Sequence, residues 1–132
     1  MRIFSLFEKE TLPLPTMNEQ FSVERNERYT VISLSAEKLD TLVAPALKSE
    51  LVMLNADGVR NLIIDLGSAR YCDSSGLSAI LVANRLCKNA DGILVLTNLQ
   101  ESVRKLINIS QLDSILQIVP DVETAAQQFE VA

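Results

Sequence analysis

The sequence predicts an α/β fold in which a mixed, mostly parallel β-sheet carries four helices. Short runs rich in valine, isoleucine and leucine alternate along the chain with stretches whose apolar residues recur at helical spacing. The run NLIIDL at 61–66 is typical of a strand buried on both faces of a sheet. Because strands that alternate with helices need crossover connections, we expect most strands to be parallel.

The first elements are expected to be a β-hairpin and a helix. Apolar runs at 21–24 and 29–34 flank the polar sequence RNER, which favours a turn. A helix follows within 40–58, and Pro45 belongs in its first turn because proline lacks the amide that a helix interior needs. The spacing of the leucines predicts a buried face formed by Leu47, Leu51 and Leu54.

The rest of the chain repeats the alternation of strand and helix. Further strands are expected at 61–66, 93–97 and 115–119. Helices are expected at 77–88, 99–107 and 122–129. Asn98 and Glu101 have the spacing of a capping pair, and Asp121 is expected to cap the last helix.

Length and composition indicate one globular domain. The chain has 132 residues and is 48% hydrophobic, which suits one continuous core. Residues 1–20 contain TLPLPT and no sustained periodicity, so we expect an N-terminal extension or linker before a domain at 21–132. No apolar stretch approaches the ~18 residues of a membrane span, and Glu8 to Glu10 interrupt any signal-peptide core. These features predict a cytoplasmic protein without a membrane partner.

Composition also excludes several kinds of chemistry. A net charge of −5 argues against direct nucleic-acid binding. The chain has no histidine, which removes Ser-His-Asp catalysis and imidazole metal ligation. Its four glycines cannot form a dinucleotide fingerprint or a phosphate loop, and Cys72 and Cys87 are expected to be buried apolar residues. We therefore predict no catalytic residue, no metal and no cofactor.

The sequence YCDSSGLSAI at 71–80 has three interpretations: a helix cap, a nucleophile or a phosphate acceptor. A nucleophilic Ser74 would need a G-x-S-x-G elbow and a base, and the chain lacks both. Asp73 or Ser74 is well placed to cap the helix that follows, and such a helix start also favours an added phosphate. Capping and phosphate acceptance are therefore compatible. A Ser102-x-x-Lys105 match is interpreted as chance spacing on a helix surface.

Several of these segments resemble the STAS domain of bacterial anti-sigma factor antagonists. The resemblance covers about 21–129, and its most specific element is CDSSGL after the strand LIIDL. It implies the fold predicted above and a non-enzymatic regulator in a partner-switching system. In such a system the antagonist binds an anti-sigma factor that is also a serine kinase, phosphorylation from ATP releases it, and a serine phosphatase acts on the phosphorylated form.

The resemblance also implies roles for particular residues. Ser74 corresponds to the phosphoacceptor. The phosphorylation-loop and partner-binding residues would be Asp40, Asp73, Ser75, Gly76 and Leu77. This loop and the helix from Leu77 to Lys88 would form much of the partner surface. The chain departs from the family pattern at Ala36, at Lys38 and at Gln111, which replaces a common glycine.

Two alternatives remain open at this point. The chain could be a STAS scaffold that is never phosphorylated, for example an accessory subunit of a transport ATPase or of a sensory complex. A small hydrolase that uses Ser74 is the third interpretation, and the absence of histidine argues against it.

Overall fold

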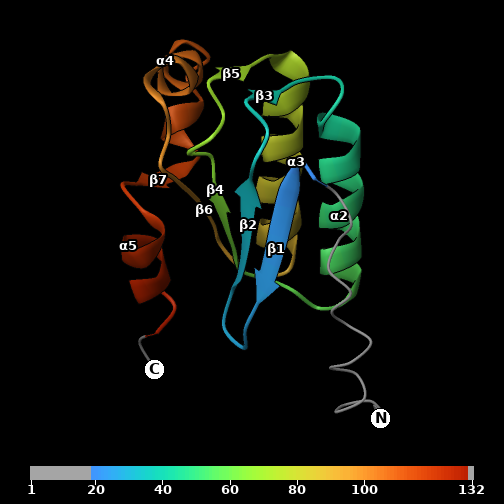
Figure 1. Cartoon of the computed structure of the whole chain (residues 1–132). Helices are drawn as coiled ribbons and strands as arrows, with labels where there is room; N and C mark the ends of the chain where they lie inside the picture. Colours follow the sequence, from blue (N-terminus) through green and yellow to red (C-terminus); the bar gives the residue numbers. More distant parts are fainter. Residues whose placement is uncertain (1–18, 131–132) are drawn as a thin grey trace.

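Five strands form one mixed sheet in the order β1-β2-β4-β6-β7 in the computed structural model, which describes residues 19–130 (Figure 1). The strands are β1 (Phe21–Arg25), β2 (Thr30–Leu34), β4 (Leu62–Asp65), β6 (Leu94–Thr97) and β7 (Gln117–Val119). β1 runs antiparallel to β2, as the predicted hairpin requires, and every other pair is parallel. The predicted mixed, mostly parallel sheet is confirmed.

Helices cover both faces of this sheet (Figure 1). The α-helices of the described residues are α2 (Ala44–Ala56), α3 (Ser74–Asn89), α4 (Glu101–Ile109) and α5 (Val122–Gln127). The first three pack on one face, where Leu47, Ile80 and Ile107 join the main core. On the other face α5 buries Ala125 against Val95 in a smaller cluster.

The predicted helix faces and caps agree with the structure at most positions. Leu47, Leu51 and Leu54 are all buried in α2, and Pro45 lies in its first turn. Asp121 caps α5 by accepting a hydrogen bond from the Thr124 amide at 2.8 Å.

The predicted cap of α4 is wrong. The N-cap of this helix is Gln100, whose side chain makes no capping hydrogen bond. Asn98 has a left-handed backbone with φ of 56°, and its Nδ2 donates instead to Asp65 Oδ1 at 3.1 Å. The side-chain amide of Asn98 therefore links the ends of the neighbouring parallel strands β4 and β6.

The last strand is shorter than predicted. A 3₁₀ helix, η1 (Leu112–Ser114), follows α4, and Ile115 still belongs to its turn. Gln111, which replaces a common family glycine, has φ of 62° at the junction between α4 and η1. The strand expected at 115–119 therefore begins only at Gln117.

A second, two-stranded sheet was not predicted. β3 (Lys38–Leu39) pairs in parallel with β5 (Tyr71–Cys72) at the end of the molecule where α2 and α3 begin (Figure 1). This pairing joins two loops that are far apart in the sequence.

The expected extension at 1–20 lies mostly outside the described residues. Of its two described residues, Gln20 accepts hydrogen bonds through its carbonyl oxygen from the amides of Ser35 and Ala36. The boundary at residue 21 stays a prediction. In the part of the chain that the structure describes, every helix is too short or too polar to span a membrane.

Candidate functional site

The pairing of β3 with β5 brings Asp40 and Asp73 to the same end of the small sheet. Leu39 and Cys72 are register partners, and each aspartate directly follows one of them. The amide of Asp73 also donates to the carbonyl oxygen of Leu39 at 3.3 Å. The structure thus brings together two of the residues that the sequence assigned to one site.

Asp73 is the N-cap of α3. Its backbone is extended, and its Oδ1 accepts hydrogen bonds from the amides of Ser75 at 2.9 Å and Gly76 at 3.0 Å. The sequence left open whether Asp73 or Ser74 is the cap, and the structure assigns the role to Asp73. Ser74 is then the first residue of a 16-residue helix.

The side chain of Ser74 is exposed. Among residues 19–130 its hydroxyl has no hydrogen-bond partner, because the capping role is already filled by Asp73. The hydroxyl is therefore free to meet an approaching group from solvent.

Asp40 organises the start of α2 in a similar way. Its Oδ1 accepts from the Leu42 amide at 3.0 Å, and its carbonyl oxygen accepts from the amides of Val43 and Ala44. Asp40 and Asp73 are both half-buried. The Asp73 carboxylate thus caps α3, while the Asp40 carboxylate holds the turn that leads into α2.

The remaining predicted site residues lie deeper. Ser75 is half-buried, while Gly76 and Leu77 are buried. Leu77 packs in the main core, so its side chain supports the loop from below. The most exposed residue of the predicted site is therefore Ser74, and Asp40, Asp73 and Ser75 are half-buried.

Cys72 is not a nucleophile in this setting. It is 8% exposed, and burial together with the charge of Asp73 raises its pKa from 9.0 to about 11. Burial also raises the pKa of Cys87 to about 11. Both thiols are therefore protonated near neutral pH, and both are buried as the sequence predicted.

Sequence reasoning missed two exposed apolar side chains at this end of the molecule. Leu42, in the loop between β3 and α2, is 80% exposed, and Tyr71 in β5 is 51% exposed. The sequence offered one signal for the exposure of Leu42, because this residue does not fit the spacing of the buried leucines in the following helix. The exposure of Tyr71 could be inferred only once the pairing of β5 with β3 was known.

The Ser102-x-x-Lys105 match has no catalytic geometry. The hydroxyl of Ser102 donates to the carbonyl oxygen of Arg70, and Lys105 pairs with Glu101 at 3.7 Å. Within residues 19–130 there is also no group of three or more metal-ligating side chains.

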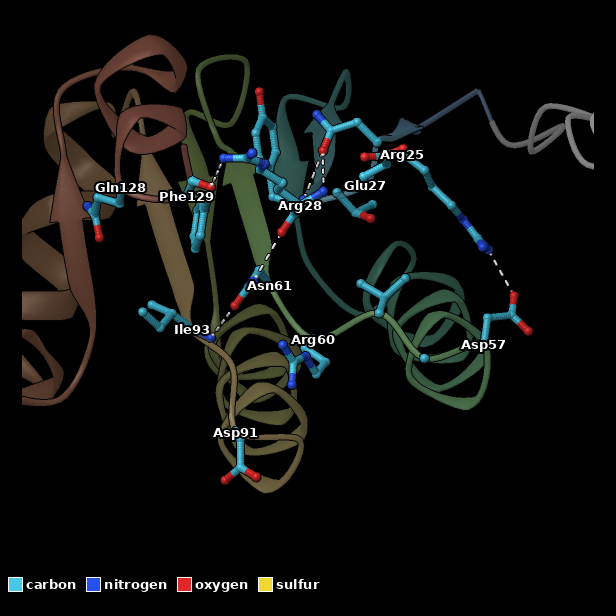
Figure 2. A pocket seen from close by; sticks show the side chains of 15 residues that line it. Arg25, Glu27, Arg28, Asp57, Arg60, Asn61, Asp91, Ile93, Gln128 and Phe129 are labelled. Carbon is cyan, nitrogen blue, oxygen red and sulfur yellow. Dashed lines mark hydrogen bonds and ion pairs between the residues drawn. The ribbon is translucent and has the colours of Figure 1, made fainter. Parts of the chain in front are cut away.

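A hollow of about 620 Å³ lies at the opposite end of the sheet (Figure 2). It is lined by the β1–β2 turn and by the segments before β4 and β6, so it faces the amino ends of the parallel strands. Its ionisable lining residues other than Tyr29 are Arg25, Arg28, Arg60, Glu27, Asp57 and Asp91. Because the positive and negative groups balance, this hollow has no net charge with which to select an ionic ligand.

Comparison with known proteins places this geometry in context. Residues 20–125 match the sequence profile of the STAS domain. The chain is 32% identical over 111 residues to the anti-sigma-B factor antagonist of Bacillus subtilis, covering 84% of this chain and 100% of that protein.

Solved structures show the same fold. An anti-sigma factor antagonist from Mycobacterium paratuberculosis superposes with a TM-score of 0.74 at 23% identity, covering 84% of this chain and 93% of that one. The anti-sigma factor antagonist SpoIIAA in its unphosphorylated form gives a TM-score of 0.66 at 22% identity, covering 82% of this chain and 94% of the other.

Proposed function

Because the chain belongs to the STAS domain family, and within it to the anti-sigma factor antagonists, we propose that it is a switch controlled by phosphorylation of Ser74. Unmodified, it binds an anti-sigma factor that is also a serine kinase. Phosphorylation from ATP releases it, and a serine phosphatase restores the binding form. Members of this group are regulators and not enzymes, so the prediction of a non-enzymatic protein is confirmed by the membership.

The observation that carries the proposal is the exposed hydroxyl of Ser74 at the start of α3. Asp73 supplies the cap, so Ser74 is not needed for the helix to form. A phosphoryl group on this hydroxyl would lie beside the amides and the positive dipole end of a long helix. The fold is thereby able to carry the modification with little change in stability.

The same phosphate would strongly weaken the binding of a partner protein. It adds a charge of about −1.5 to −2 at neutral pH. One unit of repulsion with a partner carboxylate at ~5 Å and an effective dielectric constant of ~20 is worth about 3 kcal/mol. That energy corresponds to a roughly hundredfold loss of affinity, which is enough to separate the two proteins.

The test is to incubate the protein with ATP and the anti-sigma factor kinases of its own genome, and to map phosphate by mass spectrometry. We expect modification of Ser74 and not of the neighbouring Ser75. A Ser74→Ala variant should bind the kinase persistently, and Ser74→Asp should bind at least tenfold more weakly. Ser75→Ala is the matched control and should remain a substrate.

Other outcomes would favour the alternatives. An unmodified Ser74 in the presence of a kinase that phosphorylates its other substrates would contradict the switch and favour a STAS scaffold in a transport or sensory assembly. The switch also places the protein in the cytoplasm, where ATP, the kinase and the sigma factor meet.

A further inference from the structure

Ser74 is presented to its kinase as part of a folded element. The amides of Ser75 and Gly76 are bonded to the Asp73 carboxylate, and the Leu77 amide donates to the Asp73 carbonyl oxygen. Pulling this segment into an extended peptide would break these bonds and expose Leu77, which is 9% exposed in the fold. The kinase therefore has to recognise the folded surface around Ser74.

A kinase that recognises a folded surface needs exposed side chains to contact. At this end of the molecule two large apolar side chains are exposed. Leu42 is 80% exposed and Tyr71 is 51% exposed. The other large apolar residues exposed in the described structure lie on other elements: Val52 and Met53 on α2, Ile93 before β6, and Ile109 and Ile115 on either side of η1.

The small sheet brings the segments that carry Leu42 and Tyr71 next to the segment that carries Ser74. Leu39 and Cys72 are register partners, Tyr71 precedes Cys72, and Ser74 lies two residues beyond it. Leu42 follows Leu39 by three residues and is held by the Asp40 carboxylate through its amide. Both side chains are therefore exposed on segments that adjoin the one carrying the hydroxyl to be phosphorylated.

We propose that Leu42 and Tyr71 are the apolar anchors by which the anti-sigma factor kinase recognises the folded face around Ser74. This inference rests on the proposed function of Ser74. The occupant is a protein surface with two apolar pockets, because a few side chains buried in partner pockets carry most of the binding energy at protein interfaces, and tyrosine is enriched among them. The anchors are uncharged, so they contribute to binding before and after phosphorylation, and the phosphate alone provides the switch.

The test compares variants that are matched for exposure. Leu42→Ala is paired with Ile109→Ala, since these side chains are 80% and 79% exposed. Tyr71→Ala is paired with Ile115→Ala, at 51% and 50%. Each full-length protein is checked for folding by circular dichroism. The dissociation constant for the kinase without ATP and the kcat/KM for phosphorylation of Ser74 are then measured.

We expect Leu42→Ala and Tyr71→Ala each to raise the dissociation constant and lower kcat/KM at least tenfold. Ile109→Ala and Ile115→Ala should stay within twofold of the unaltered protein. If all four folded variants have equal dissociation constants and equal kcat/KM values, the proposal that Leu42 and Tyr71 are anchors is overturned. The Ser74 switch is not affected by that result. If the unaltered chain binds the kinase and is not phosphorylated, the switch fails, and the dissociation constants still decide the anchors. If it binds no kinase at all, both proposals fall.

Discussion

The carbonyl oxygen of Leu39 fills the space in which a side chain at Gly76 would begin. A Cβ built on Gly76 would lie 2.2 Å from this oxygen and 2.8 Å from Cys72 Sγ. The start of α3 therefore packs directly against the backbone of β3. Only glycine permits this close approach between the two loops of the candidate site.

Gly76→Ala should accordingly destabilise the protein. Replacing glycine with alanine inside a helix usually stabilises by about 1 kcal/mol. Here the added methyl group forces the backbone of Leu39 away, and overpacking of this kind costs roughly 1–3 kcal/mol. Urea unfolding followed by circular dichroism measures the change, with Ser78→Ala in the same helix as the control. A gain in stability in Gly76→Ala would show that the two loops are not in contact.

Asp73→Ala should weaken the start of α3. The variant loses the hydrogen bonds to the amides of Ser75 and Gly76, and the loss of such a cap costs about 1 kcal/mol. Asp73→Asn retains an acceptor oxygen and should recover most of this energy. Urea unfolding of the parent, Asp73→Asn and Asp73→Ala proteins measures the order of their stabilities. An alanine variant as stable as the parent would be inconsistent with capping by Asp73.

Both thiols should react slowly in the folded protein. Their pKa values of about 11 keep them protonated, and both are buried. At pH 8 we expect a disulfide reagent such as Ellman's reagent to modify the folded chain far more slowly than the chain in urea. Cys72, in a two-residue strand, should react before Cys87, and the Cys72→Ala variant identifies which thiol is modified.

These thiols also give the stability of the fold a pH dependence. A pKa that is raised on folding stabilises the protein fully below the unfolded value of 9.0. The contribution is lost as the pH rises from about 9 toward about 11. The unfolding free energy of the parent should therefore fall more steeply over this range than that of a Cys72→Ala, Cys87→Ala double variant. If the unfolding free energies of the two proteins fall in parallel over this pH range, the assignment of raised pKa values to the two thiols is contradicted.

Asn61→Ala should lower stability without changing the site. Asn61 Nδ2 donates to the Arg28 carbonyl oxygen at 3.1 Å, and its Oδ1 accepts from the Ile93 amide at 3.0 Å (Figure 2). Losing both bonds should cost about 1–2 kcal/mol in urea unfolding. Because this hollow lies at the far end of the sheet, the affinity for the kinase should stay the same. Exposed Asn55→Ala on α2 serves as the control.

Gln111→Gly should stabilise the protein. Gln111 has φ of 62°, in the left-handed region that costs a residue with a side chain roughly 1 kcal/mol. Glycine avoids this strain where the helix ends. In the middle of α4 the same type of change has the opposite effect, so replacing the exposed Arg104 by glycine (Arg104→Gly) should destabilise by a similar amount. Thermal unfolding of both variants checks the sign.

The alternation of strands and helices was readable from the sequence because each main element is long enough to show its period. β3 and β5 have two residues each, too few for any periodicity, and their pairing depends on contacts between distant loops. Asn98 was assigned as a cap from its spacing to Glu101. The sequence could not show that its amide would bind Asp65 across the sheet.

The candidate site, like the fold, could be predicted from the sequence only in part. A local motif predicted a cap at Asp73 or Ser74, and the extended backbone of Asp73 before the helix agrees with it. The family resemblance of that motif carried the prediction that Ser74 is the phosphoacceptor. Leu42 was assigned no role, because the pairing of Leu39 with Cys72, which brings its loop toward the loop of Ser74, depends on the tertiary structure.

The pairing of β3 with β5 has a consequence for the timing of folding. Contacts between residues distant in the sequence form late, because a long loop must close first. In a chain that has not yet folded, Ser74 has its local motif while β3 and β5 are still unpaired. A kinase that recognises the proposed anchors would therefore act on the folded chain in preference to the unfolded one.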